Sequence, residues 1–223
     1  SPFNASALAF YLSQVEWLTV YLGPIPWLAL STLESLIFGL GMAVSALVWS
    51  WLERSLKSTW KNLAIAGALA TIWTAREWVA CNLPYGGFPW SRVAQSLSDS
   101  FLASLTYYLG ISGLTFLAVL ATVLVMQLIS KQRPQLSTLA ALLLITATAL
   151  GTSPPIAAET GTLRVGAIQG NANAGLFSNV ERGAILDNHI DETRVMLAEL
   201  EKNDLDLVVW PENASDLSPL SSD

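Results

Sequence analysis

Residues 101–129 read FLASLTYYLGISGLTFLAVLATVLVMQLI and contain no charged side chain. A helix needs about 20 consecutive apolar residues to cross the hydrocarbon core of a bilayer, so this stretch predicts a membrane-spanning helix. Further apolar runs lie on both sides of it. Together they predict an α-helical membrane bundle of about five spans, at residues 3–22, 27–52, 62–80, 101–129 and 136–151.

The composition changes after the last apolar run. The whole chain is 52% hydrophobic and only 13% charged, against about 25% charged residues in an average soluble domain. Residues 1–153 hold seven Lys and Arg against five Asp and Glu, whereas residues 154–223 hold four against twelve. We therefore expect a membrane domain over residues 1–152 and a water-facing domain from residue 153 onward. The sequence has no basic patch of the kind that binds nucleic acid.

The charges of the connecting loops predict the orientation of the bundle. Cytoplasmic loops carry an excess of Lys and Arg, and the loops at 53–61 and 130–135 carry three and two basic residues. The connection 81–100 carries only Arg92. With five spans, residues 81–100 and 153–223 then lie outside the cytoplasm. Tryptophans near the predicted span ends fit an aromatic belt at the membrane interface, namely Trp27, Trp49, Trp51, Trp78 and Trp90.

The acidic part of the chain has the pattern of a strand, a helix and a second strand. Residues 163–171 form a short apolar run that ends in Gly and Asn, which predicts a buried strand. Residues 181–202 distribute apolar side chains among charges, which predicts an amphipathic helix. Residues 205–210 predict the second strand. This order of elements predicts a βαβ unit with parallel strands.

The second predicted strand ends in Trp210-Pro211-Glu212. Ligands of α/β proteins bind at the carboxyl ends of strands. A carboxylate placed there against Trp and Pro is partly desolvated, and this environment suits a general base. Glu212 is therefore the candidate catalytic residue. The alternative is a strand-end acid that faces solvent.

These stretches resemble a known family. Residues 165–171, followed by LVVWPE at 207–212, are similar to the opening of a nitrilase-type carbon–nitrogen hydrolase domain. REW at 76–78, followed by GFPW at 87–90, resembles the loop before a membrane span in the apolipoprotein N-acyltransferases. In that family a nitrilase-like domain outside the cytoplasm is joined to a membrane bundle. Glu212-Asn213 and the stretch 187–191 resemble the actinobacterial branch of this family.

The resemblance implies a fold and a cellular location. The fold is a multi-span α-helical membrane bundle, residues 1–152, followed by the first βαβ portion of an α/β nitrilase-like sandwich, residues 153–223, which is incomplete. The location is the inner membrane of a bacterial cell, with the second part outside the cytoplasm.

The resemblance also implies a reaction. A cysteine thiolate takes an acyl chain from a phospholipid and passes it to the N-terminal amine of the diacylglyceryl-cysteine of a lipoprotein. Glu212 is the implied base, and a lysine stabilises the oxyanion. The family pattern places this lysine and the nucleophilic cysteine after Asp223. The 223 residues alone are therefore expected to be inactive.

Four further residues are candidate substrate contacts. Glu77 lies beside the GFPW loop and is expected to shape a lipid entrance, while Phe88, Trp90 and Trp210 are expected to contact substrate. The alternative for Glu77 is structural pairing with its neighbour Arg76. The alternative for the rings of the GFPW loop is anchoring at the membrane interface.

Other polar residues are expected to have structural roles. Glu16 and Glu34 interrupt apolar runs and are expected to face the bundle, where they form hydrogen bonds. Cys81 is expected to be half-buried, whereas His189 and Lys202 are expected at the surface of the amphipathic helix. One cysteine and one histidine exclude a disulfide within the chain and a cysteine or histidine metal cluster. No metal or cofactor is predicted.

Two other functions stay open. A membrane-anchored amidase or nitrilase would hydrolyse a carbon–nitrogen bond with the same three residue types, using water in place of the lipoprotein amine. A non-catalytic relative would act as a membrane scaffold, for example for a polyprenol-phosphate mannose synthase, to which actinobacterial relatives can be joined. The many predicted spans argue against the amidase or nitrilase alternative, because a membrane anchor alone would not need a multi-span bundle. A downstream sequence without the lysine or the cysteine would favour the scaffold.

Overall fold

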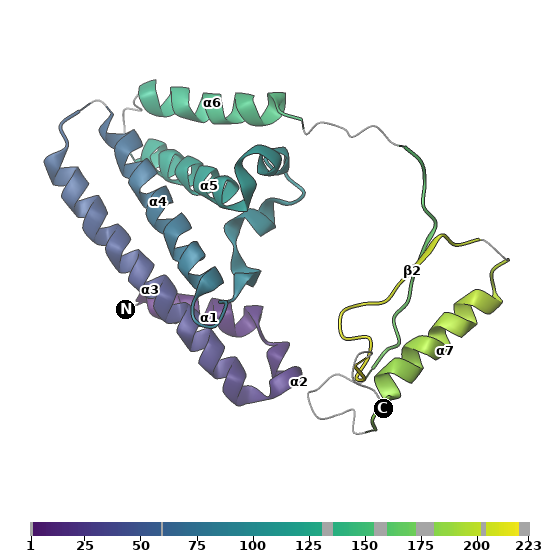
Figure 1. Ribbon diagram of the computed structural model, residues 1–223. Coiled ribbons are helices and arrows are strands. Elements are labelled where there is room, and N and C mark those ends of the chain that lie inside the picture. Colours follow the sequence, from purple (N-terminus) through teal and green to yellow (C-terminus); the bar gives the residue numbers. More distant parts are fainter. Residues whose placement is uncertain are drawn as a thin grey trace. The chain divides into compact units, whose positions relative to one another are not determined.

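The computed structural model describes residues 2–58, 60–130, 136–153, 160–172, 181–201 and 204–218, with the backbone alone for residues 2–4. The elements of this described part are α1 (Pro2–Gln14), α2 (Leu18–Leu22), α3 (Pro24–Ser55), α4 (Lys61–Asn82), the short 3-10 helices η1 (Pro89–Ser91), η2 (Val93–Leu97) and η3 (Ala103–Leu105), α5 (Thr106–Ser130), α6 (Leu136–Gly151), β1 (Val165–Ala167), α7 (Ala184–Ala198) and β2 (Leu207–Val209) (Figure 1). The chain divides into two compact units, Ser1–Glu16 with Leu28–Ile156 and Trp17–Trp27 with Ala157–Asp223.

Helices occupy the predicted spans. Two helical segments of the described part, α3 and the stretch Ala103–Ser130 that contains α5, are long and apolar enough to cross a membrane. α4 covers the predicted third span but carries Arg76 and Glu77 near its carboxyl end. α6 has 16 residues, fewer than the roughly 20 of a full span.

The predicted first span, 3–22, is not one helix. α1 ends at Gln14 and α2 begins at Leu18, with a turn over residues 15–17 between them. The turn carries Glu16, which is exposed and does not face the bundle as expected. A charge inside a continuous apolar helix is costly, and the turn leaves this carboxylate at the surface.

α4 and α5 pack against each other and form the centre of the helical unit. The side chains buried between and around these helices are mostly small or aliphatic and include Ile65, Ala66 and Ala70 of α4 and Leu114 and Leu124 of α5. Small residues allow helix backbones to approach closely in membrane bundles. This packing places the end of α4, where the charged residues lie, against the first half of α5.

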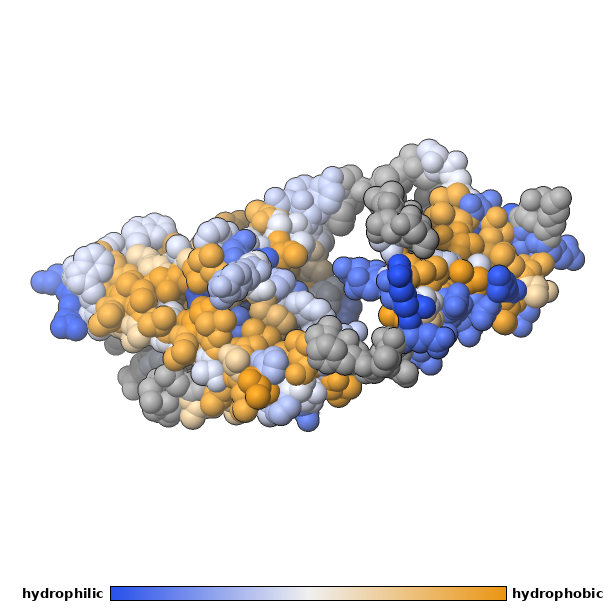
Figure 2. Space-filling view, turned by 60° about the horizontal axis from the view of Figure 1, so that its bottom comes forward, coloured by the Kyte–Doolittle hydropathy of each residue, from blue (hydrophilic) through white to orange (hydrophobic). Residues whose placement is uncertain are grey.

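Much of the surface of the helical unit is apolar. α3 exposes large aliphatic and aromatic side chains along its length, among them Leu28, Leu36, Leu40, Leu47 and Trp51. In Figure 2 the surface over the helices is largely hydrophobic, whereas the surface over α7 mixes hydrophilic and hydrophobic side chains. Large exposed apolar patches mark binding or membrane surfaces. The helices of this unit are therefore membrane-associated.

β1 and β2 form a parallel two-stranded sheet, and α7 connects them in the order that the sequence predicts. The register pairs Val165 with Leu207, Gly166 with Val208 and Ala167 with Val209. Each strand has three residues and is shorter than predicted. The βαβ order and the parallel pairing are confirmed, while the described residues do not form a second sheet of the expected sandwich.

His189 is buried, and the prediction of a surface histidine is wrong. It is 2% exposed on α7, and its ring centroid lies 5.7 Å from that of Trp210. Its Nδ1 lies 2.8 Å from the carbonyl oxygen of Ile185. Gly170, which follows β1, lies so close that a Cβ at this position would overlap the imidazole ring. α7 turns this side chain toward the strand ends, although its neighbours in sequence are charged.

Asp216 caps the N-terminus of α7 from a position far along the chain. Its Oδ2 accepts the backbone N–H of Gly183 at 2.6 Å, and its Oδ1 accepts that of Leu186 at 3.3 Å. These bonds satisfy donors that the start of a helix leaves without a partner. Desolvation acts to raise the pKa of Asp216, but the backbone hydrogen bonds outweigh it and lower this pKa below its usual value.

Lowering the pH should therefore weaken the hydrogen bonds that hold the N-terminal turn of α7. A carboxylate whose pKa is lowered by folding stabilises the folded state above its unfolded pKa of about 3.9, and this stabilisation disappears as the pH falls through the folded pKa. We expect amide exchange at 183–186 in the full chain, corrected for its intrinsic pH dependence, to become faster below about pH 4. The variant Asp216→Ala should exchange fast already at neutral pH.

Asp191→Ala is the matched control, because Asp191 is an exposed acid on α7 that pairs with Arg194. It should leave the exchange at 183–186 unchanged. Full protection of these amides in Asp216→Ala would show that this carboxylate does not hold the helix start.

Candidate functional site

Four charged side chains meet near the carboxyl end of α4. Glu34 of α3 and Glu77 of α4 are each 2% exposed, Arg76 is 8% exposed, and Arg92 lies between η1 and η2. Arg92 Nε lies 3.6 Å from Oε2 of Glu77, and Arg76 Nη2 lies 3.8 Å from Oε1. We call these four residues the charge cluster. Buried charges are costly unless they are paired, and two acids here balance two bases.

Glu77 has the largest set of hydrogen bonds in the charge cluster. Its Oε1 accepts the indole N–H of Trp73 at 3.1 Å and the backbone N–H of Val93 at 2.9 Å. Its Oε2 accepts the hydroxyl of Thr115 at 3.0 Å. Trp73 belongs to the same helix, Val93 opens η2, and Thr115 belongs to α5. One carboxylate thus joins three separate segments.

Arg76 also contacts residues of α1 and α3. Its Nη1 donates to the hydroxyl of Tyr11 at 3.4 Å. Its guanidinium carbon lies 5.3 Å from the ring centroid of Phe38 and 4.8 Å from that of Trp73, within reach of a cation–π interaction. Gly41 of α3 makes room for the Arg76 stem, because a Cβ there would lie 2.8 Å from Cδ. Arg76 thereby links α1 and α3 to α4.

The GFPW loop folds back on the end of α4. The backbone N–H of Phe88 donates to the carbonyl oxygen of Ala80 at 2.7 Å. Gly87 has a φ of +69°, and a Cβ there would collide with the backbone of Ala80 and Cys81. Glycine alone combines a favourable positive φ with the absence of a Cβ, and this position requires both. The loop then continues into η1, which contains Trp90, and through Arg92, a member of the charge cluster, into η2.

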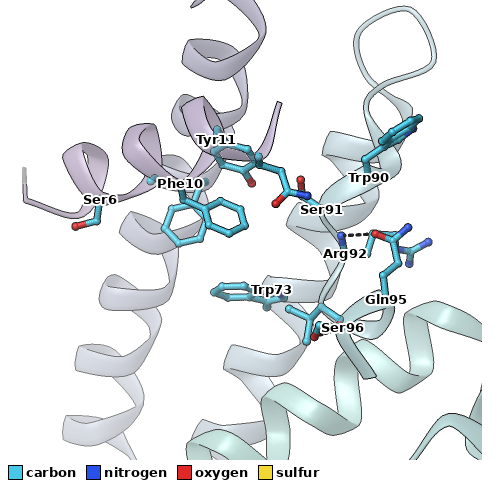
Figure 3. Close-up of a pocket in the computed structure, with 13 residues that line it drawn as sticks. Ser6, Phe10, Tyr11, Trp73, Trp90, Ser91, Arg92, Gln95 and Ser96 are labelled. Carbon is cyan, nitrogen blue, oxygen red and sulfur yellow. Dashed lines mark hydrogen bonds between the residues drawn. The ribbon is translucent and has the colours of Figure 1, made fainter. Parts of the chain in front are cut away.

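A pocket of about 690 Å³ opens between α1 and the segment 90–96. Phe10 and Tyr11 reach it from α1 and Trp73 reaches it from α4 (Figure 3). Its polar lining consists mainly of uncharged side chains, namely Ser6, Gln14, Ser91, Gln95 and Ser96, together with Arg92. The volume falls in the range of about 300–1,000 Å³ that is usual for ligand sites. We call it the aromatic pocket.

The predicted site residues of the bundle take different positions around this pocket. Trp90 lines it and is exposed, and its ring stacks on that of Phe88 with centroids 5.9 Å apart. Phe88 is half-buried and lines a smaller cavity beside the charge cluster. Glu77 lies behind the pocket wall and does not line it. Cys81 is half-buried and free, as expected.

Glu212 follows β2 and is exposed. The expected desolvation by Trp210 and Pro211 is therefore not provided by the described residues. Trp210 is half-buried, and its indole N–H donates to the hydroxyl of Thr193 on α7 at 3.0 Å. Thr193 in turn donates to the carbonyl oxygen of His189 at 2.6 Å. Trp210 thus ties the strand end to the helix.

Sequence reasoning missed Arg92 and Thr193. Arg92 was visible in the sequence as the only basic residue of the connection 81–100, and this isolation was a usable signal. The sequence around Thr193 offered no such signal. Lys202 lies outside the described residues. Within the part of the chain that the structure describes, no group of three or more His, Cys, Asp or Glu side chains could hold a metal ion.

These features define a membrane-associated helical protein with a pocketed bundle and a parallel βαβ unit. The family model of the apolipoprotein N-acyltransferase N-terminal domain matches residues 4–124. The apolipoprotein N-acyltransferase of Mycolicibacterium smegmatis is 31% identical over 96% of this chain and 38% of its own length. The apolipoprotein N-acyltransferase of Shewanella oneidensis is 31% identical over 83% of this chain and 34% of its own length. The apolipoprotein N-acyltransferase of Photobacterium profundum is 33% identical over 64% of this chain and 27% of its own length.

The chain therefore belongs to the apolipoprotein N-acyltransferase family, and the resemblance noted in the sequence is confirmed. It spans 38% or less of the length of these relatives.

Gly87→Ala should destabilise the loop that carries the site. The added Cβ meets backbone atoms at a positive φ, so we expect a cost of about 2 kcal/mol or more. The readout is the thermal unfolding midpoint of the full chain in detergent micelles. Gly67→Ala is the control, because Gly67 lies inside α4 with nothing within 4 Å of its would-be Cβ. It should stabilise the helix by up to about 1 kcal/mol. Equal midpoints for the two variants would contradict this account of the loop.

Proposed function

We propose that this chain is the N-terminal part of an apolipoprotein N-acyltransferase, in which it supplies the lipid-guiding bundle and the general base. The observation that carries the proposal is the 31% identity to the Mycolicibacterium smegmatis enzyme over 96% of the chain. A match of this extent includes both the helices and the strand end at Trp210–Glu212.

In the proposed reaction a cysteine thiolate attacks the ester carbonyl of a phospholipid. The ester C–O bond breaks, the lysophospholipid leaves as an alcohol, and an acyl thioester remains on the enzyme. The N-terminal amine of a diacylglyceryl-cysteine then attacks the thioester, which forms an amide and regenerates the thiol. Glu212 removes the thiol proton, returns it to the leaving alkoxide, and later removes the amine proton.

The nucleophile and the oxyanion-stabilising lysine are assigned to residues that follow Glu212, as the family pattern implies. Cys81 is not assigned, because it is half-buried at the end of a helix in the membrane-associated unit. Lys202 is not assigned, because it precedes the strand that ends in Glu212. The 223 residues alone should therefore transfer no acyl chain.

The exposure of the strands supports a larger domain around Glu212. Val165 and Leu207 are each 50% exposed and Val209 is 45% exposed. Parallel sheets are normally covered on both faces. We infer that residues 153–223 open a nitrilase-like sandwich, whose other elements cover these strands and desolvate Glu212. Residues 1–152 are the membrane domain of this proposal.

The orientation follows from the basic loops. The positive-inside bias assigns residues 53–61 to the cytoplasm and residues 81–100 and 153–223 to the outer side of a bacterial inner membrane. In this orientation the GFPW loop and Glu212 face the same compartment, where a lipoprotein acceptor would arrive.

The aromatic pocket is the proposed place for an acyl chain. Its rings come from α1, α4 and the segment 90–96, and its volume suits one apolar ligand chain. Arg92, which lines the pocket, and Arg76, which lies beside it, each have a guanidinium nitrogen within 4 Å of the Glu77 carboxylate, so an uncharged chain in the pocket meets a guanidinium group that already has a counter-charge. Trp90 lies at its rim and Phe88 supports Trp90 by stacking.

Photo-crosslinking tests this pocket. The full chain is reconstituted in bilayers that contain a phospholipid with a diazirine in its acyl chain, and labelled peptides are identified by mass spectrometry. We expect labels on α1 and on the segment 90–96. Ala7→Trp fills the pocket from α1, where Ala7 is buried in its lining, and should remove most of these labels. Ala9→Trp, at an exposed position of the same helix, should not.

Ser96→Trp narrows the same pocket from an exposed position and serves if Ala7→Trp does not fold. Labels that persist unchanged in a folded pocket-filling variant would refute the acyl-chain site.

Glu212 is tested by acyl transfer in the protein expressed from its complete reading frame. Glu212→Gln should lower the rate of N-acylation of a diacylated lipopeptide by about 10²–10⁴-fold, since a general base contributes on this scale. Glu199→Gln, which alters an exposed acid after α7, should keep the rate. Transfer unaffected by Glu212→Gln would remove Glu212 from the mechanism. Hydrolysis of a simple amide without any transfer would favour the amidase alternative.

A further inference from the structure

The carboxylate of Glu77 is fully engaged by the protein. It accepts three hydrogen bonds of 2.9–3.1 Å, from Trp73, Val93 and Thr115. Two guanidinium groups lie within 4 Å of it. A carboxylate has about four acceptor sites, so little capacity remains for a ligand. Because the Glu77 side chain is only 2% exposed, we expect it to bind other parts of the protein and not a ligand.

Two of its partners belong to the segment 92–93. The backbone N–H of Val93 donates to Oε1 of Glu77, and Arg92 Nε lies 3.6 Å from Oε2. Arg92 extends the connection to α5, because its Nη2 donates to the hydroxyl of Ser112 at 2.6 Å. The segment is thus held to α4 through a carboxylate and to α5 through a guanidinium group. Hydrogen bonds to charged groups are stronger than neutral ones.

The same segment forms one wall of the aromatic pocket. Ser91, Arg92, Val93, Gln95 and Ser96 all line it, opposite Phe10 and Tyr11 of α1 (Figure 3). Within the segment, Gln95 Oε1 accepts the backbone N–H of Arg92 at 3.2 Å. The position of this wall therefore depends on what holds residues 92 and 93.

We propose that Glu77 is a positioning residue, which fixes the segment 89–97 through Val93 and Arg92 and thereby sets the width of the aromatic pocket. This differs from the sequence-based expectation that Glu77 contacts lipid. The inference rests on the proposed function in one respect only, namely that a lipid chain is what the pocket holds.

Removing the Glu77 charge has a specific consequence for Arg92. In Glu77→Gln the amide can still accept the N–H of Val93, but the guanidinium group of Arg92 loses its counter-charge. A buried charge without its partner is strongly unfavourable, so the segment should move to bring Arg92 toward water. Removing both charges together, in Glu77→Gln with Arg92→Gln, should be less harmful than the change at Glu77 alone.

Glu34→Gln provides the matched control. Glu34 is as deeply buried as Glu77 and belongs to the same charge cluster. It lies on α3, and no hydrogen bond from it to the segment 89–97 is found in the described part of the chain. A general effect of losing a buried carboxylate should therefore appear equally in Glu34→Gln, whereas a positioning effect should not.

The experiment measures hydrogen exchange of the full chain in lipid nanodiscs, peptide by peptide. In Glu77→Gln we expect peptides covering 89–97 to exchange about tenfold faster, as the loss of charge assistance in their hydrogen bonds implies, while α5 beyond residue 115 keeps its protection. Glu34→Gln should leave 89–97 unchanged. The double variant with Arg92→Gln should recover part of the protection, because it removes the unpaired guanidinium charge, and only part, because it also removes the hydrogen bond to Ser112.

Unchanged exchange at 89–97 in Glu77→Gln, or an equal increase in Glu34→Gln, would overturn the proposal. So would a double variant that exchanges as fast as, or faster than, Glu77→Gln. Crosslinking by the diazirine phospholipid in the unaltered chain is measured in parallel. Absence of crosslinks with a positive exchange result would refute the lipid pocket and leave the positioning role standing.

Discussion

The buried carboxylate of Glu77 is the constraint on which the helical part of the structure depends. A charge in an apolar bundle is tolerated only when hydrogen bonds and counter-charges compensate for its lost hydration. α4 can supply one hydrogen-bond donor, Trp73, and the remaining partners must come from α5 and from the loop after α4. Satisfying one side chain therefore closes the loop against the bundle. The aromatic pocket lies between that closed loop and α1.

A smaller polar network organises the βαβ unit. His189 is packed against Trp210 and over Gly170, and Thr193 connects the indole of Trp210 to the backbone of α7. The ends of both strands are thereby fixed to the same face of one helix. Glu212 follows β2 at this place, so the network fixes the strand end that carries Glu212. Asp216 completes the arrangement by holding the start of α7.

Several features could be read from local sequence, and others could not. Apolar runs located α3, α4, α5 and α6, and the strand–helix–strand pattern located the parallel sheet. The break at 15–17 was missed, because two polar residues in an apolar run are compatible with a helix that faces a bundle as well as with a turn. The burial of His189 was missed, because its charged neighbours in sequence point elsewhere on the helix. The desolvation of Glu212 stays a prediction, since the described residues leave it exposed.

Family membership supports the proposed acyl transfer, and the structure separates the charged residues by their contacts. Glu77 and Arg92 hold a loop, Arg76 holds α1 and α3, and Glu212 stands apart on a strand end. The sequence by itself determined which segments are apolar enough for a membrane and which form the βαβ unit, because hydrophobicity and periodicity are properties of neighbouring residues. Only the tertiary structure decided that Glu77 faces Val93, Thr115 and Arg92, because partners 16 and 38 residues away meet through helix packing and loop closure, which no local pattern encodes.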